Sequence, residues 1–153
     1  MLATYKAWGI NPHPLAWSEV FTALQQRVID GQDNPYISIL ANKFYEVQKY
    51  ITEVNYFQWT GPIVISEKRY QSLSPEIRNI LTKASVDAAL YQQKWVEENI
   101  DAAKAELIKK GMSVCALTDE EEWKSRARSV WPQFYDSMGG KALADKALEY
   151  LKK

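Results

Sequence analysis

Residues 15–27 carry apolar side chains at helical spacing, at Trp17, Val20, Phe21 and Leu24. This spacing predicts an amphipathic helix. A second helical stretch is predicted from about residue 36 to residue 47. The dipeptide before it is a helix-start signal, because asparagine suits a helix cap and proline suits the first helical position. We therefore expect Asn34 to cap this helix and Pro35 to open it.

Two short segments have the composition of β-strands rather than helices. Residues 49–57 (KYITEVNYF) are rich in β-branched and aromatic residues, which is typical of strands. Residues 62–66 (PIVIS) predict a second short strand, and residues 112–117 are compatible with a third. The chain is therefore expected to contain a few strands among its helices.

The longest predicted element is a helix over about residues 74–110. Ser74 is a good cap and Pro75 a good first residue, and neither glycine nor proline follows until Gly111. A further helix is predicted from residue 118 to about residue 131, and a last one over residues 141–153. The order of elements is helix-rich with a few strands, so we assign the chain to the α/β class.

The amino-acid composition argues against several classes of function. The 153 residues hold 19 basic and 19 acidic side chains, so net charge does not favour nucleic-acid binding. One cysteine and one histidine exclude a disulfide framework and a Cys- or His-based metal site. No apolar run approaches the roughly 18 residues of a membrane span. The sequence suits one ordinary globular domain.

No arrangement of residues indicates catalysis. The chain has no glycine-rich phosphate loop and no serine–histidine–aspartate pattern. Glu120, Glu121 and Glu122 stand at a predicted helix start, where acidic side chains offset the helix dipole. Cys115 lies in an apolar stretch and is expected to be a small core residue. These residues favour a binding or structural protein over an enzyme, and no cofactor is expected.

Two sequence motifs are more specific to one protein family than the rest of the chain. Residues 14–25 read PLAWSEVFTALQ, and residues 29–35 read IDGQDNP. Together with residues 43–50 and the Leu73–Glu76 helix start, they closely resemble the solute-binding subunits of TRAP (tripartite ATP-independent periplasmic) transporters. That family carries a helix with an aromatic residue before Ser-Glu-Val and then a Gly-Gln-Glu-Asn-Pro word. The resemblance covers essentially the whole chain.

The resemblance implies the C-terminal part of a two-lobed, periplasmic-binding-protein-like fold. In such proteins the two lobes capture small organic acids, of the C4-dicarboxylate or sialic-acid type, for delivery to a membrane permease. Carried over by position, the ligand contacts become Trp17 and Asn34. Phe57 and Trp59 match a region that lines the ligand cleft. Three alternatives stay open: Trp17 as a core aromatic, Asn34 as a plain helix cap, and core packing for Phe57 and Trp59.

Members of that family run to about twice this length. Residues 1–153 are therefore expected to form a single truncated domain that corresponds to the C-terminal half. The arginine that clamps the ligand carboxylate in the family would stand before Met1, so ligand binding is expected to be weakened or lost. The alternative is a self-associating structural or interaction module without a transport function, since a half-fold exposes apolar surface, and a homo-oligomer is then expected.

The family is periplasmic. The N-terminus, MLATYKAWGINPHP, has no signal-peptide pattern, so a cytoplasmic location is expected for the chain as written.

Overall fold

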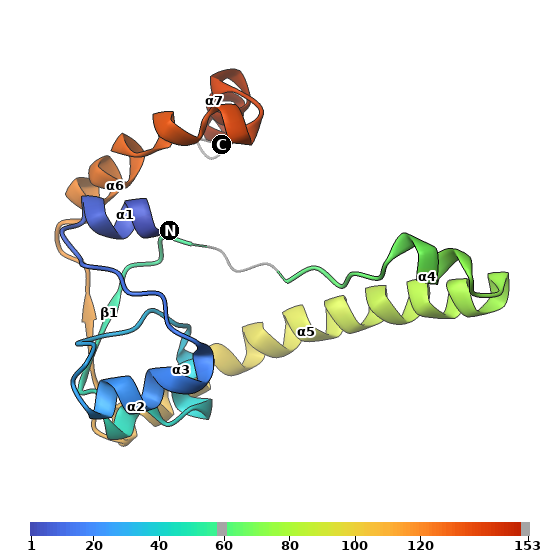
Figure 1. Ribbon diagram of the computed structural model, residues 1–153. Coiled ribbons are helices and arrows are strands. Elements are labelled where there is room, and N and C mark those ends of the chain that lie inside the picture. The colour runs from blue at the N-terminus through green and yellow to red at the C-terminus, as the bar shows by residue number, and fades with distance from the viewer. Residues whose placement is uncertain (58–60, 151–153) are drawn as a thin grey trace. The chain divides into compact units, whose positions relative to one another are not determined.

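The computed structural model describes residues 1–57 and 61–150 and divides the chain into two compact units. We name residues 1–19 with 116–153 the terminal unit, and residues 20–115 the central unit. The fold is helix-rich with few strands, which confirms the expected α/β class (Figure 1).

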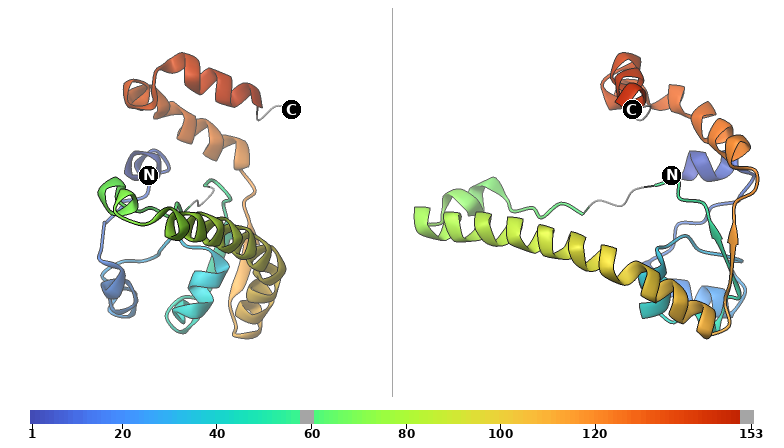
Figure 2. Two further views of the ribbon diagram at one scale, coloured as in Figure 1. Left: turned by 90° about the vertical axis from the view of Figure 1, so that its right-hand side faces the viewer. Right: turned by 180° about the vertical axis from the view of Figure 1, so that it is seen from behind.

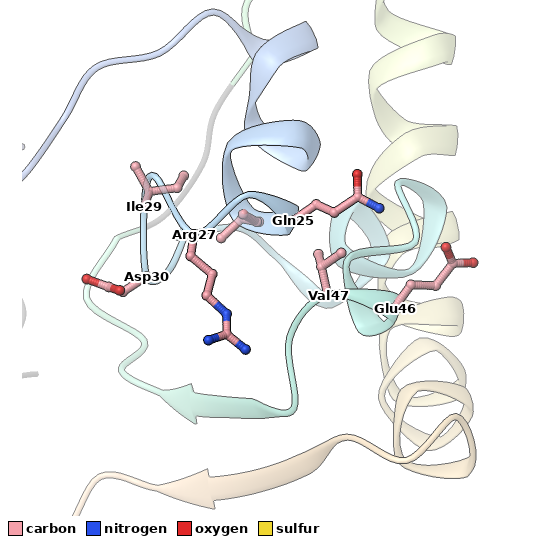
Figure 3. A pocket seen from close by; sticks show the side chains of 7 residues that line it. Gln25, Arg27, Ile29, Asp30, Glu46 and Val47 are labelled. Atoms are coloured by element: carbon pink, nitrogen blue, oxygen red, sulfur yellow. The ribbon is translucent and has the colours of Figure 1, made fainter.

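The central unit holds four α-helices, one 3₁₀-helix and two strands in its described part. They are α2 (Val20–Gln25), α3 (Tyr36–Ala41), η2 (Phe44–Glu46), β1 (Tyr50–Glu53), α4 (Glu67–Gln71), α5 (Pro75–Lys109) and β2 (Ser113–Ala116). β1 and β2 form a two-stranded sheet whose strands run in the same direction in Figure 3. A parallel pair needs a long crossover, and α5 lies on that connection.

The core of the central unit surrounds the last turns of α5. Its buried side chains are Leu24, Ile39, Phe44, Leu107 and Met112. Leu107 has no exposed surface. Helix α3 packs against α5 (Figure 2). Val20, Phe21, Ile29 and Ile51 add partly buried apolar surface around this cluster. The short helices and the sheet are therefore held together by one end of a single long helix.

Helix α5 confirms the prediction of one long helix. The Ser74 hydroxyl accepts a hydrogen bond from the Ile77 backbone N–H at 3.3 Å, and Pro75 is the first helical residue. At the other end Gly111 adopts a φ of +93°, a left-handed conformation that glycine tolerates without a Cβ penalty. Both ends of the helix therefore lie where the local sequence places them.

The terminal unit contains α1 (Leu2–Ala7), η1 (Trp17–Glu19), α6 (Glu120–Ser129), η3 (Trp131–Phe134), η4 (Asp136–Met138) and α7 (Lys141–Tyr150). Two tryptophans join α1 to α6. The indole N–H of Trp8 donates to the backbone carbonyl of Trp123 at 2.9 Å, and the two rings lie 4.8 Å apart. The tilted contact between the rings and this hydrogen bond together hold α1 against α6.

Several predicted boundaries are wrong for local reasons. The strand expected over 49–57 covers only Tyr50–Glu53, and Asn55 takes a left-handed φ of 49° just beyond it. Residues 62–66 form no strand, since Pro62 offers no N–H to a ladder and the described sheet has two strands only. The helix expected over 36–47 is interrupted at Lys43, which has a φ of 57°.

Two smaller expectations also need correction. The first predicted helix is shorter than 15–27: η1 and α2 together cover Trp17–Gln25, and Arg27 follows with a left-handed φ of 59°. Cys115 is exposed rather than a core residue. In β2 the partly buried side chain is that of Val114.

The packing of the core predicts how much stability the protein loses when either of two leucines in α5 is replaced by alanine. Replacement of buried Leu107 by alanine is expected to lower the free energy of unfolding by about 2–5 kcal/mol, because a cavity forms where close packing is lost. The matched substitution Leu90→Ala removes a side chain that is 62% exposed and should change it by less than about 0.5 kcal/mol. Urea unfolding of both variants measures the difference, and equal losses would contradict this description of the core.

Candidate functional site

The loop before α3 carries the first of the predicted ligand contacts. Asn34 does not cap α3: Pro35 is the capping residue, with a ψ of 155°, and no side chain bonds the first turn. The Asn34 amide nitrogen instead donates to Oε1 of Gln32 at 2.6 Å. The amide is thus held by its own loop, and the expectation of a helix cap is wrong.

A second segment lies beside this loop. The Tyr56 hydroxyl donates to Oδ2 of Asp33 at 2.6 Å, which ties residues 56–57 to the loop that carries Asn34. Phe57 is 52% exposed, and its ring lies 6.1 Å from that of Tyr56. The structure therefore brings two of the predicted residues, Asn34 and Phe57, onto neighbouring segments. Trp59 lies outside the described residues.

A polar cluster of Tyr36, Glu53 and Lys104 fastens the same region to α5. Oε1 of Glu53 accepts hydrogen bonds from the Tyr36 hydroxyl at 2.5 Å and from the Lys104 ammonium at 2.7 Å. The Lys104 ammonium also lies 5.8 Å from the centroid of the Tyr36 ring. The start of α3, the end of β1 and α5 thus share one carboxylate.

This cluster shifts two ionisation equilibria. The hydrogen bond from Lys104, followed by that from Tyr36, lowers the pKa of Glu53 below its usual value. Burial, the hydrogen bond to Glu53 and its negative charge together raise the pKa of Tyr36. Tyr36 consequently remains a neutral donor, and Glu53 remains ionised, over the whole neutral range.

Trp17 belongs to the terminal unit. It opens η1 and its side chain is 52% exposed, so it is not a fully buried core aromatic. Its role as a ligand contact stays a prediction.

A separate pocket of about 440 Å³ opens in the central unit, at the turn after α2 (Figure 3). Its lining residues are Leu24, Gln25, Arg27, Ile29, Asp30, Glu46 and Val47. None of the four predicted contacts is among them. One guanidinium and two carboxylates leave this pocket with net negative charge, which opposes the binding of an organic acid. We therefore place the candidate site at the 32–34 loop and residues 56–57, and not in this pocket.

Neither a metal centre nor a membrane segment is found in the described part of the chain. Across residues 1–57 and 61–150, no group of three or more histidine, cysteine, aspartate or glutamate side chains is arranged to hold a metal ion. Nor does any described helix combine the length and apolar character that crossing a bilayer requires.

Sequence reasoning did not identify the residues that position the site. Tyr36, Glu53 and Lys104 lie far apart in sequence, on two helices and a strand, and no periodic pattern connects them. Asp33 lies within the IDGQDNP motif, so its position next to Asn34 could be seen in the sequence. Its partner Tyr56 could be found only from the fold.

Comparisons with known proteins agree on one family. Residues 1–138 match the model of the family described as bacterial extracellular solute-binding protein, family 7. The C4-dicarboxylate-binding periplasmic protein DctP of Shewanella loihica is 37% identical over 152 residues, which cover 97% of this chain and 45% of that protein. The ectoine/5-hydroxyectoine-binding periplasmic protein UehA of Ruegeria pomeroyi is 33% identical over 150 residues, 94% of this chain and 44% of that protein.

A solved structure gives the same result for the fold. The apo, open crystal structure of a TRAP periplasmic solute-binding protein from Rhodobacter sphaeroides matches 99% of this chain and 50% of its own chain, with 45% identity and a TM-score of 0.76. The resemblance to TRAP solute-binding subunits is thereby confirmed. The chain spans about half the length of the relatives that it matches.

The shared carboxylate predicts a specific pH dependence. Because the pKa of Glu53 is lower in the folded than in the unfolded protein, its contribution to stability is present above the ordinary glutamate value of 4.5 and is lost as the pH falls through the folded pKa. Glu53→Gln should therefore lower stability at about pH 7 and flatten the loss of stability between about pH 5 and pH 3.

Urea unfolding across that pH range measures the effect. Glu98→Gln is the matched control, since Glu98 is exposed and its ammonium partner on Lys94 lies 3.7 Å away. Acid sensitivity that is the same in Glu53→Gln as in the unsubstituted protein would show that the cluster does not stabilise the fold.

Proposed function

This chain belongs to bacterial extracellular solute-binding protein family 7, and we propose that it forms part of a surface that captures a small organic acid. The observation that supports this most is the placement of Asn34 and Phe57. Two segments that the family resemblance marks as ligand-contacting lie side by side, joined by the Tyr56–Asp33 hydrogen bond. The proposed ligand class is a C4-dicarboxylate or a related small carboxylate, in line with the name of the Shewanella relative.

Asn34 is the proposed hydrogen-bond donor to the ligand. A side-chain amide carries two N–H donors. One of them is directed to Gln32, which fixes the amide plane and leaves the second N–H for a carboxylate oxygen. A donor held in place before binding loses little conformational entropy when the ligand arrives.

Aromatic side chains are the proposed walls of the site. Phe57 is 52% exposed, which leaves ring surface to cover the carbon skeleton of a ligand. Trp17 and Trp59 are proposed as ligand contacts on the family resemblance. Small-molecule sites commonly combine such apolar walls with a few fixed polar groups.

Residues 1–153 alone are proposed to bind more weakly than the longer relatives. The clamping arginine that the resemblance implies has no counterpart among these residues. A charge-assisted hydrogen bond contributes about 1.5–3 kcal/mol, and its absence corresponds to roughly ten- to hundredfold weaker binding. We further propose, from the family, a periplasmic place of action and a membrane permease as the partner that receives the ligand.

Substitution of Asn34 tests the proposed donor. Asn34→Ala is expected to weaken succinate or malate binding by about ten- to hundredfold, because one hydrogen bond to a charged group is lost. Asn42→Ala is the matched control: Asn42 is exposed, caps the C-terminal end of α3, the opposite end from Asn34, and its amide donates to the Ser38 carbonyl at 2.9 Å. Isothermal titration calorimetry at millimolar ligand measures both.

Two results would contradict the proposal. One is an equal loss of affinity in the two asparagine variants, which would place the ligand elsewhere. The other is the absence of saturable binding by succinate, malate and ectoine, which would favour a module that keeps the fold without capturing a solute. One observation supports this alternative of a structural or interaction module: several large apolar side chains of α5 are exposed.

A further inference from the structure

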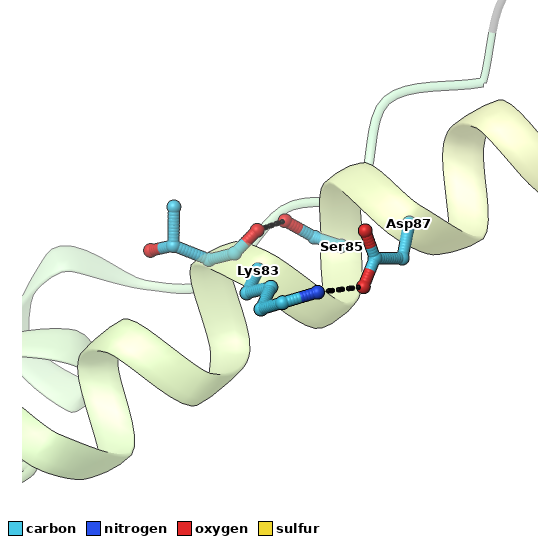
Figure 4. Close-up of polar contacts among 4 residues, drawn as sticks. Lys83, Ser85 and Asp87 are labelled. Carbon is cyan, nitrogen blue, oxygen red and sulfur yellow. Dashed lines mark hydrogen bonds and ion pairs between the residues drawn. The ribbon is translucent and has the colours of Figure 1, made fainter.

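One ion pair of this protein differs from the others in what it joins. In the described part of the chain, eight of the nine ion pairs link side chains three or four residues apart in sequence. Lys83 and Asp87 on α5 are an example, at 2.7 Å, with side chains that are 78% and 60% exposed (Figure 4). Exposed pairs of this kind contribute little to stability. The ninth pair joins Lys104 on α5 to Glu53 on β1, and these side chains are only 35% and 28% exposed.

Lys104 stands on the part of α5 that belongs to the core. Ala103 beside it and Leu107 one turn further on are the buried residues of this helix. Oε1 of Glu53 accepts hydrogen bonds from the Lys104 ammonium at 2.7 Å and from the Tyr36 hydroxyl at 2.5 Å. One carboxylate therefore connects Tyr36 to the buried end of α5.

Tyr36 is the first residue of α3, a helix that has few means of holding its own start. The helix has six residues, and no side chain bonds its first turn. A helix this short is not stable by itself. Ile39, in its middle, is buried in the core, and the Tyr36 hydroxyl holds its first residue. Asn34 lies two residues before Tyr36, so a shift at the start of α3 reaches the proposed ligand contact.

We propose that Glu53 is a positioning residue for the ligand site, and that it acts through Tyr36 on Asn34; this inference rests on the proposed function. Glu53 is no ligand contact itself, because a carboxylate repels an organic acid. Its role is to hold the loop in its binding geometry before the ligand arrives. The ligand then does not have to order the loop, and the entropic cost of binding is lower.

Loss of this anchor lowers the fraction of molecules whose loop is ready to bind. The apparent dissociation constant rises in inverse proportion to that fraction. The hydrogen bond from Tyr56 to Asp33 remains and still holds part of the loop. The fraction is therefore expected to fall to roughly a third to a tenth, and the dissociation constant for a small carboxylate to rise about three- to tenfold.

Tyr36→Phe tests the anchor through the loss of a single oxygen atom. An NMR titration with succinate should give a dissociation constant about three- to tenfold above that of the unsubstituted chain. Tyr70→Phe is the matched control, because the Tyr70 hydroxyl also contacts α5, at 3.2 Å from the Thr82 hydroxyl. Thr82 lies about 33 Å along the helix from Lys104, so this variant should stay within about twofold.

Two replacements of Glu53 separate the hydrogen bond from packing. Glu53→Leu removes both acceptor oxygens and should weaken succinate binding at least as much as Tyr36→Phe. Glu53→Gln keeps one oxygen that can accept from Tyr36, and should lose less affinity than Glu53→Leu. Asp87→Leu removes the carboxylate of an exposed ion pair on the same helix as Lys104 and should leave the affinity within about twofold. Urea unfolding of each variant shows that it is folded under the conditions of the titration.

A measurement without ligand separates this inference from the proposed function. The ¹⁵N order parameters of the backbone amides of Asp33 and Asn34 should be near about 0.85 in the unsubstituted chain, as in rigid backbone. They should fall below about 0.6 in Tyr36→Phe, as in flexible backbone, and should not change in Tyr70→Phe.

Three results would overturn the inference while the proposed function stands. The first is a chain that binds succinate, loses affinity in Asn34→Ala and keeps it in Tyr36→Phe. The second is an equal loss of affinity in Tyr36→Phe and Tyr70→Phe, which would show a general effect of lower stability. The third is unchanged order parameters at residues 33–34 in Tyr36→Phe. Absence of saturable binding by the unsubstituted chain would instead overturn the proposed function, and this inference with it.

Discussion

Leu107, near the end of α5, is fully buried against Leu24, Ile39, Phe44 and Met112, and the central unit depends on this contact. Three short elements meet there, and none of them has enough residues to be stable by itself. Burial of their apolar faces against one long helix supplies that stability. The rest of α5 contributes little to this core, since Ala103 and Leu107 are its only buried residues.

The candidate site is positioned by the same helix. α3 packs on α5, and the loop that carries Asn34 leads directly into α3. Two hydrogen bonds then hold this loop and the start of α3 against β1 and the residues that follow it. They run from Tyr36 to Glu53 and from Tyr56 to Asp33. A charged partner on α5, Lys104, completes the first of these contacts. The site is thus made of loop residues, as binding sites often are, but it rests on buried helix packing.

The sequence predicts the parts of this protein that are encoded locally. Ser74, Pro75 and Gly111 predicted the two ends of α5. Two short motifs near the N-terminus predicted the family. Boundaries that depend on single backbone angles were missed, such as the end of β1 before Asn55 and the break at Lys43. Asn34 shows the limit for the site: its loop was predicted, but Gln32 rather than α3 holds its amide. The Tyr36–Glu53–Lys104 cluster joins distant residues and only the fold reveals it.

The central claim is that a small carboxylate binds at the 32–34 loop and the neighbouring residues 56–57. A two-dimensional ¹H–¹⁵N NMR titration of the chain with succinate tests this most directly. The account predicts saturable shifts of the Asn34 side-chain amide together with the backbone amides of Asp33, Tyr56 and Phe57. Saturable shifts confined to the pocket of Arg27, Asp30 and Glu46, or no saturable shifts, would contradict it.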